Sequence, residues 1–217
     1  IVAVGRNTDR TQASITGLKN AKAWIGDITS SKACDEIAAF ALMEFGRIDT
    51  LINNAGIIFR CTTMTTTDQQ WTETIATNLT APFFLSRAAL PELIKNKGSI
   101  INIASDWGLI GGTAALAYCA SKGGLVLMTK AMALDHAREG VRVNAICPGD
   151  VDTPMLNKEA AQRGVNYDEA MANNNSDSPT GRITMPSEVA ALAYYLASNA
   201  AAQITGTTIS IDGGNTA

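Results

Sequence analysis

Short apolar runs alternate along the chain with longer stretches of helical character, and no other feature restricts its fold as much. This order is typical of βαβ units, in which crossover helices join parallel strands. Several of the runs are apolar almost throughout, as expected of strands that are covered on both faces. The predicted strands are Ile1–Val4, Ala21–Ile25, Ile48–Asn53, Ser99–Ala104, Val141–Ile146 and Thr207–Ile211. The sequence therefore predicts an α/β fold with a doubly wound parallel sheet between two helical layers.

The helices predicted between these strands carry signals at their ends. Ser30 or Ser31 can cap the second helix, and Gly46 follows its end. Pro82 and Pro91 lie inside the third, where they predict a kink and then a stop. The predicted helices are Asp9–Leu18, Ser31–Phe45, Asp68–Ile94, Ala115–Glu139 and Ser187–Ala197.

The segment 153–184 departs from this pattern, because it is polar and contains three consecutive asparagines, Asn173 to Asn175. A loop of this length in a compact domain is usually a lid or a binding loop, so we predict a substrate lid here. The 217 residues show no linker and no repeat, which indicates one domain over residues 1–217.

Composition and charge exclude several classes of protein. The chain is 46% hydrophobic and 17% charged, which is unlike a disordered protein. A net charge of -3 and the lack of a basic stripe argue against nucleic acid as the main partner. The four cysteines are far apart and fit neither a zinc site nor a disulfide scaffold, so reduced thiols in a cytoplasmic protein are expected. No apolar run is long enough to cross a membrane.

Tyr118 and Lys122 form the first candidate pair for chemistry. Residues four apart share one face of a helix, so the phenol and the ammonium can address one site. A nearby ammonium favours the phenolate and lowers the pKa of a tyrosine, which can then act as a general acid or base. An exposed pair that meets by chance is the alternative, and the surrounding motifs decide between the two.

Three further features precede this pair. Ser105 follows a predicted strand, and ligands of open parallel sheets bind at the carboxyl ends of the strands. The turn Asn53-Asn54-Ala55-Gly56 closes another strand with small residues that let a ligand approach the backbone. Asn78 lies within a predicted helix, where asparagine is unfavourable, and its amide is expected to interrupt the helix and to hold a water. A turn serine and an ordinary turn are the structural alternatives for the first two.

With these motifs the sequence resembles the short-chain dehydrogenase/reductase family, in its single-domain form of the 3-oxoacyl-reductase and glucose-dehydrogenase type. The matching motifs are NNAG at 53–56, Asn78, Ser105, YCASK at 118–122, PGDVDTPM at 148–155 and ITGTTISIDGG at 204–214. Their order agrees along the whole chain. The resemblance implies a Rossmann fold and an NAD(P)-dependent oxidoreductase that interconverts an alcohol and a ketone or aldehyde by hydride transfer.

By this resemblance, Tyr118 exchanges a proton with the substrate oxygen, and Lys122 binds the nicotinamide ribose and lowers the pKa of Tyr118. Ser105 orients the substrate, and Asn78 helps to hold a proton-relay water. The cofactor contacts implied, besides Tyr118 and Lys122, are Asp27, Ile28, Asn54, Ala55, Gly56, Pro148, Gly149, Val151 and Thr153.

The end of the first predicted strand bears on the choice of cofactor. An acidic residue there would bind the ribose 2′-hydroxyl of NAD, whereas an arginine accommodates the 2′-phosphate of NADP. Gly5 and Arg6 occupy this place, so NADP is favoured over NAD. A solvated arginine is the structural alternative.

The resemblance fails at the beginning of the chain, which opens directly on the strand Ile1–Val4. The family's first strand and its Gly-rich turn, which bind the pyrophosphate, have no counterpart in this sequence. That strand would lie between the first and third strands predicted here, so we expect an interrupted sheet and an N-terminally truncated sequence that lacks about 30 residues.

The positions beside the motifs are expected to shape the substrate pocket. They are large apolar groups and one carboxylate, among them Phe59, Asp106, Trp107 and Met155. A small or medium neutral alcohol or ketone, cyclic or sugar-like, suits this set. No metal ion is expected.

Two other functions remain open at this point. A sugar-nucleotide epimerase or dehydratase shares the Tyr-x-x-x-Lys motif but usually has a longer C-terminal domain. A dinucleotide-sensing protein without catalytic activity would be expected to lack Tyr118, Lys122 or Ser105. The resemblance also implies a homo-oligomer, usually a tetramer.

Overall fold

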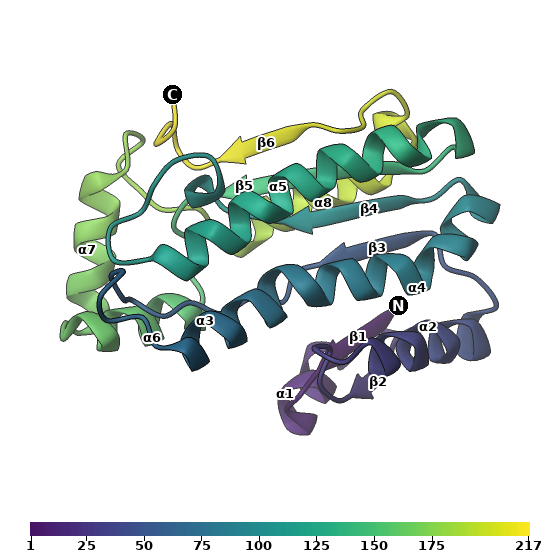
Figure 1. Ribbon diagram of the computed structural model, residues 1–217, viewed down its shortest axis with the longest axis horizontal. Coiled ribbons are helices and arrows are strands. Elements are labelled where there is room, and N and C mark those ends of the chain that lie inside the picture. Colours follow the sequence, from purple (N-terminus) through teal and green to yellow (C-terminus); the bar gives the residue numbers. More distant parts are fainter.

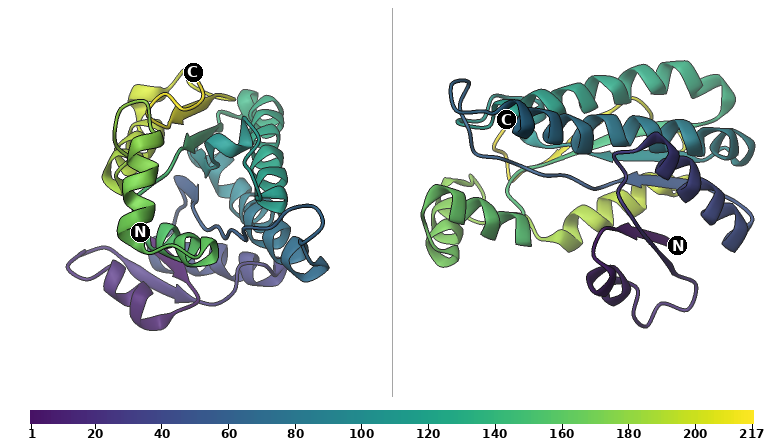
Figure 2. Two further views of the ribbon diagram at one scale, coloured as in Figure 1. Left: turned by 90° about the vertical axis from the view of Figure 1, so that its left-hand side faces the viewer. Right: turned by 60° about the horizontal axis from the view of Figure 1, so that its bottom comes forward.

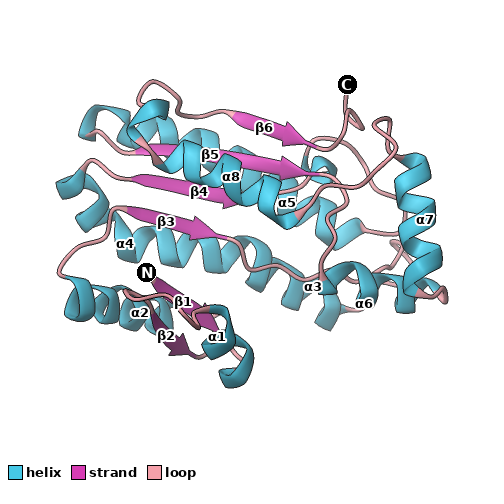
Figure 3. Cartoon of the chain, turned by 180° about the vertical axis from the view of Figure 1, so that it is seen from behind, coloured by secondary structure: helices cyan, strands magenta, loops and turns pink.

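The structure is a computed structural model that describes residues 1–217. Its strands are all parallel and form two hydrogen-bonded sheets, one of order β1-β2 and one of order β3-β4-β5-β6 (Figures 1 and 3). The strands are β1 (Val2–Gly5), β2 (Lys22–Ile25), β3 (Thr50–Asn53), β4 (Ser99–Ile103), β5 (Arg142–Pro148) and β6 (Thr208–Ile211). The predicted α/β fold with parallel strands is confirmed, and each predicted strand is present.

Helices cover both faces of the larger sheet. The helices are α1 (Thr8–Ser14), α2 (Ser31–Phe45), α3 (Asp68–Ile75), α4 (Ala81–Asn96), α5 (Leu116–His136), α6 (Pro154–Arg163), α7 (Tyr167–Asp177) and α8 (Pro186–Ala197). Helices α4 and α5 lie on one face and α8 on the other, while α6 and α7 stand beyond the carboxyl ends of the strands (Figures 1 and 2). Ser30 caps α2, and Gly46 ends it with φ 72°, as the sequence predicts.

The two sheets do not join. No strand pairing links β1 to β3, and Val4 and Ile52 on these strands keep 38% and 48% of their surface exposed. The interruption therefore lies where the sequence predicts it, between the first and third predicted strands.

The predicted helix over 68–94 is divided into three parts. A π-helical turn, η1 (Ala76–Thr80), separates α3 from α4. Pro82 explains the change of register, because it has no N–H group for the carbonyl of Asn78 four residues earlier. The predicted stop at Pro91 is wrong: α4 continues to Asn96 and ends at Lys97, which has φ 52°.

The prediction of a loop over 153–184 is also wrong, because α6 and α7 occupy most of it. Gly164, with φ 75°, ends α6, and the side chain of Asn166 caps α7 by accepting a hydrogen bond from the N–H of Glu169. Ala160 and Ala170 are buried, so the two polar helices pack through small side chains.

The largest core cluster lies between α4, α5 and the strands β4 and β5, with Leu93 fully buried at its centre. Replacing Leu93 with alanine should lower the free energy of unfolding by about 2–5 kcal/mol, because it removes apolar contacts and leaves a cavity. Urea denaturation would measure the loss. Met43→Ala is the control, since Met43 is 71% exposed and its replacement should change stability by less than about 0.5 kcal/mol.

No helix is both long and apolar enough to serve as a membrane span.

Candidate active site

The carboxyl end of β4 and the first turns of α5 bring three of the predicted catalytic residues together. Ser105 follows β4 by two residues and caps the short 3-10 turn Asp106–Gly108. Tyr118 and Lys122 lie one turn apart near the start of α5. Gly108 makes the close approach possible, because a Cβ atom at this position would stand 2.9 Å from the backbone carbonyl of Lys122.

Lys122 is a buried cation, 3% exposed, without a carboxylate partner. Its Nζ donates to the carbonyl of Ile103 at 2.7 Å. A Cβ atom on Gly56 would lie 3.5 Å from this Nζ and 3.6 Å from Oδ1 of Asn78, so the NNAG turn lies against both side chains. Burial lowers the pKa of Lys122 from 10.5 to about 8.

Tyr118 is half-buried beside the indole of Trp107, with the ring centroids 6.2 Å apart in an edge arrangement. Burial raises the pKa of Tyr118, the Ser105 hydroxyl opposes this rise, and the charges of Asp106 and Glu159 reinforce it. The sequence led us to expect that Lys122 lowers the pKa of Tyr118, but the net effect of the surroundings is to raise it. The ammonium lies 5.7 Å from the ring centroid, and the loss of hydration on burial outweighs it.

Asn78 is fully buried in the π-helical turn, and its amide is engaged on both sides. Oδ1 accepts from the N–H of Ile57 at 2.8 Å, while Nδ2 donates to the Ile57 carbonyl and to Oγ of Ser121 at 2.9 and 3.0 Å. The side chain thus anchors the loop after NNAG to α5. Both hydrogens of the amide are used in these contacts.

The positions matched to the cofactor follow the carboxyl ends of several strands. Pro148 ends β5, and Val151 forms an isolated parallel bridge with Thr184. Thr153 precedes α6 but makes no capping bond with its side chain, so its hydroxyl has no partner in the helix. Gly149 directly follows β5 and packs on Asp212, while Gly56 lies three residues after β3.

The smaller sheet carries the remaining matched positions. Arg6 and Asp27 are exposed and follow the paired ends of β1 and β2, where Gly5 is in register with Ile25. A hydrogen bond from the Thr29 N–H lowers the pKa of Asp27, and Arg6 contributes to the lowering. Ile28 follows in the same turn, while Asn54 and Ala55 are exposed at the end of β3.

These residues fit a nicotinamide dinucleotide. An ammonium has three donors, and that of Lys122 has one protein partner, so two remain for ribose hydroxyls. The free hydroxyl of Thr153 suits the carboxamide, and exposed Arg6 suits a phosphate. No group of His, Cys, Asp and Glu side chains is arranged to hold a metal ion.

The predicted substrate residues divide into two groups. Trp107, Phe59 and Met155 are half-buried. The indole of Trp107, which contacts Tyr118, packs so closely on Gly112 that a Cβ atom there would stand 2.4 Å from it. The carboxylate of Asp106 instead turns into the protein, where Ser105, the Trp107 N–H and Asn215 bind it.

Glu159 and Gln162 of α6 both bind Arg60, and the sequence alone does not reveal these contacts. Glu159 binds the guanidinium of Arg60 at 2.8 Å in a pair whose side chains are only 16% and 14% exposed. Gln162 accepts from the backbone N–H of Arg60 at 2.8 Å, and the guanidinium lies 4.9 Å from the centroid of Trp107. About one hundred residues separate these partners, so no local pattern signals the contact.

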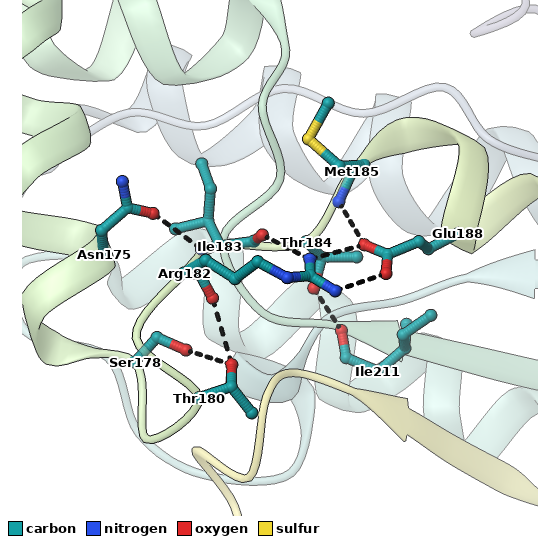
Figure 4. A network of polar contacts seen from close by, with 9 residues as sticks. All are labelled: Asn175, Ser178, Thr180, Arg182, Ile183, Thr184, Met185, Glu188 and Ile211. Atoms are coloured by element: carbon teal, nitrogen blue, oxygen red, sulfur yellow. Dashed lines mark hydrogen bonds and ion pairs between the residues drawn. The ribbon is translucent and has the colours of Figure 1, made fainter.

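The segment after α7 is fixed at the base of α8 (Figure 4). Arg182 forms two hydrogen bonds with Glu188, at 2.9 and 2.7 Å, and this pairing lowers the pKa of Glu188 to about 2. Asn175 accepts from the N–H of Ile183, and the Thr184 hydroxyl donates to the Ile211 carbonyl of β6 (Figure 4). Helices α6 and α7 are therefore attached at their C-terminal end to α8 and to β6 of the sheet.

Comparison with known proteins agrees with this arrangement. A family model described as enoyl-(acyl carrier protein) reductase matches residues 1–216. The chain is 39% identical over 191 residues to meso-2,3-butanediol dehydrogenase of Serratia marcescens, a match that covers 88% of this chain and 73% of that protein. It is 40% identical over 197 residues to D-beta-hydroxybutyrate dehydrogenase of Rhizobium meliloti, covering 88% and 76%.

Solved structures show the same fold. A variant of actinorhodin polyketide ketoreductase with NADPH superposes with a TM-score of 0.94 at 32% identity, covering 99% of this chain and 86% of that one. The ligand-free aldohexose dehydrogenase of Thermoplasma acidophilum gives a TM-score of 0.86 at 29% identity, covering 99% and 93%.

Proposed function

The chain belongs to the short-chain dehydrogenase/reductase family and is an NAD(P)-dependent oxidoreductase that interconverts an alcohol and a ketone or aldehyde, and from this premise we propose which side chains carry the reaction. The observation that carries the assignment is the convergence of Ser105, Tyr118 and buried Lys122 at the carboxyl end of β4. The bound cofactor gives or takes the hydride, which no side chain can supply.

Tyr118 is the general acid and base. In the reducing direction its phenol O–H bond breaks and the proton goes to the carbonyl oxygen while hydride reaches the carbon. In the oxidising direction the phenolate takes the proton of the alcohol. Proton transfer by a positioned group of this kind accelerates a reaction by about 10²–10⁴-fold.

The other three residues prepare the site for this step. Lys122 donates to the ribose of the cofactor and keeps its charge close to the phenol. Ser105 aligns the substrate oxygen. Asn78 holds the loop after Gly56 through its hydrogen bonds with Ile57. We assign its backbone carbonyl, which receives no N–H group from Pro82 four residues later, to a relay water.

The residues that would hold the cofactor follow the carboxyl ends of the strands. Asn54, Ala55 and Gly56 would line the adenosine ribose side, and Asp27 and Ile28 would contact the adenine. Pro148, Gly149, Val151 and Thr153 would hold the nicotinamide. Because an exposed arginine, and no acid, follows β1, NADP is the preferred cofactor and NAD the second.

Replacing Arg6 with alanine should raise the KM for NADP about 10–100-fold and leave the KM for NAD nearly unchanged, because only NADP loses a charge-assisted contact. Steady-state kinetics with both cofactors measure the two constants. Arg10→Ala is the matched control, an exposed arginine on α1 whose loss should leave both constants as they are. An equal rise with both cofactors would remove Arg6 from the 2′-phosphate site.

The substrate is a small or medium neutral alcohol or ketone. Besides burial, the carboxylates of Asp106 and Glu159 raise the pKa of Tyr118, so the site offers negative charge to a substrate. The nearest cation in sequence, Arg60, is already paired with Glu159. Trp107, Phe59 and Met155 supply apolar walls.

A panel assay with NAD and NADP tests the function and the substrate class together. It contains meso-2,3-butanediol, D-3-hydroxybutyrate, cyclic alcohols and aldohexoses, and it records the absorbance of the reduced nicotinamide. Turnover of the neutral alcohols is expected. A preference for the carboxylate, a phosphate or an acyl thioester would contradict the substrate class, and no turnover of any alcohol would contradict the function.

We further propose that residues 1–217 act as one domain and that 153–184, with α6 and α7, closes over the substrate. A homotetramer is the assembly we expect. The four cysteines are free thiols, which supports a reducing, cytoplasmic location.

A further inference from the structure

Arg60 and Glu159 form an ion pair that is largely buried, since their side chains are 16% and 14% exposed. Nη1 of Arg60 donates to Oε1 of Glu159 at 2.8 Å, and this is the one hydrogen bond of the guanidinium. Nε of Arg60 is buried without a partner. Arginine binds a carboxylate best through two parallel N–H groups, so the pair leaves part of the donor capacity of the guanidinium unused.

The guanidinium lies one side chain away from the phenol of Tyr118. Its central carbon stands 4.9 Å from the ring centroid of Trp107, and the rings of Trp107 and Tyr118 meet edge-on with their centroids 6.2 Å apart. Gln162 fixes this arrangement, because it accepts from the Arg60 backbone N–H at 2.8 Å and donates to the Ile58 carbonyl at 3.4 Å. A charge on Arg60 is therefore held beside the wall of the proposed substrate pocket.

Both charges of the pair act on titratable groups of the site. Glu159 adds to the rise that burial causes in the pKa of Tyr118. Burial also raises the pKa of Asp150 to about 6, and Glu159 adds to this rise while Arg60 opposes it. Since the two charges act in opposite directions, the intact pair offers a substrate no free positive charge.

We propose, resting on the oxidoreductase function proposed above, that Glu159 determines the charge of the substrate, because it neutralises Arg60 and so reserves the site for neutral alcohols and ketones. The other cation beside the ring of Tyr118 is Lys122, which is assigned to the ribose of the cofactor. Arg60 is therefore the cation that an anionic substrate would need, and Glu159 occupies it. An unpaired charge about 10 Å from a substrate carboxylate changes its binding by roughly tenfold at the effective dielectric constant of proteins.

The test is the ratio of kcat/KM for D-3-hydroxybutyrate to kcat/KM for the fastest neutral alcohol of the panel. This ratio does not depend on the fraction of active protein in a preparation. Glu159→Gln keeps an oxygen that can accept from Nη1 of Arg60 and removes the negative charge, so the ratio should rise about tenfold. Arg60→Gln removes the positive charge and leaves Glu159, so at pH 9, where this carboxylate is ionised, the ratio should fall about tenfold.

The two substitutions break the same ion pair but leave opposite charges, which separates charge from structure. If the pair served only to hold α6 in place, both variants would shift the ratio in the same direction. The double variant Arg60→Gln/Glu159→Gln has no net change of charge, so its ratio should return close to that of the wild type. Glu169→Gln is the matched control, because Glu169 is an exposed glutamate on α7 and its loss should leave the ratio in place.

Binding of butyrate gives a measurement that does not depend on turnover. Calorimetry with the cofactor-loaded protein should show that butyrate binds about tenfold more tightly to Glu159→Gln than to the wild type. Butyramide, which has the same size and no charge, should bind equally to both.

Several results would overturn the proposal. They are an unchanged ratio or an unchanged butyrate affinity in Glu159→Gln, shifts in the same direction in both single variants, and a wild type that already prefers D-3-hydroxybutyrate. None of them removes the oxidoreductase function, because wild-type turnover of any alcohol in the panel tests that function separately.

Discussion

Replacing Tyr118 with phenylalanine should abolish turnover while the affinity for the nicotinamide cofactor stays near normal. The substitution removes only the hydroxyl that gives and takes the proton, and a positioned acid or base contributes about 10²–10⁴-fold to the rate. The edge contact between the ring and Trp107 and the position of Lys122 depend on the ring and on the helix, which remain. Single-turnover kinetics and fluorescence titration with NADP and NAD measure the two quantities.

The two measurements together separate chemistry from folding. A variant that binds cofactor normally but has lost turnover supports Tyr118 as the acid and base. Tyr195→Phe is the matched control, because Tyr195 lies on α8, is 42% exposed and should lose its hydroxyl without effect on the rate. Retained activity in Tyr118→Phe would refute the proposed mechanism.

The strands could be predicted because their burial leaves a direct mark on the sequence. Ile100 and Ile101 of β4, and Val143 and Ile146 of β5, are fully buried, so these strands read as short apolar runs that only the buried Asn102 and Asn144 interrupt. Helices α6 and α7 leave no such mark. They bury only Leu156, two alanines and Asn174, and a polar segment with three asparagines looks like a loop when it is read without its neighbours.

The candidate site divides in the same way. The order of Asn78, Ser105, Tyr118 and Lys122 can be read from the sequence, because each residue occupies a recognisable motif. The pKa values of these side chains cannot be read from the sequence, because they depend on how deeply each group is buried and on which charges lie nearby. A phenol and an ammonium one helical turn apart suggest a lowered pKa for the tyrosine, yet burial and the carboxylates of Asp106 and Glu159 raise it.

Replacing Lys122 with methionine should impair function and stabilise the fold at the same time. Loss of the ribose contacts should weaken cofactor binding about 10–100-fold. The stability gain follows from linkage: Lys122 titrates at 10.5 in the unfolded chain and at about 8 in the folded one. Between these values the unfolded chain binds more protons, so wild-type stability rises with pH there, and the full cost of the buried charge is present below pH 8.

The expected gain at pH 7 is on the order of 2 kcal/mol, since the relief of burying the charge is partly offset by the lost bond to the Ile103 carbonyl. Urea denaturation at pH 7 and pH 9.5 measures it, and the difference between variant and wild type should narrow at the higher pH. Lys130→Met, an exposed lysine on the same helix, is the control and should show neither change. Destabilisation at pH 7 would mean that the ammonium, although buried, contributes more to the fold through its contacts than its burial costs. Active sites of this kind keep a charge that the fold alone would not select, because the cofactor needs it.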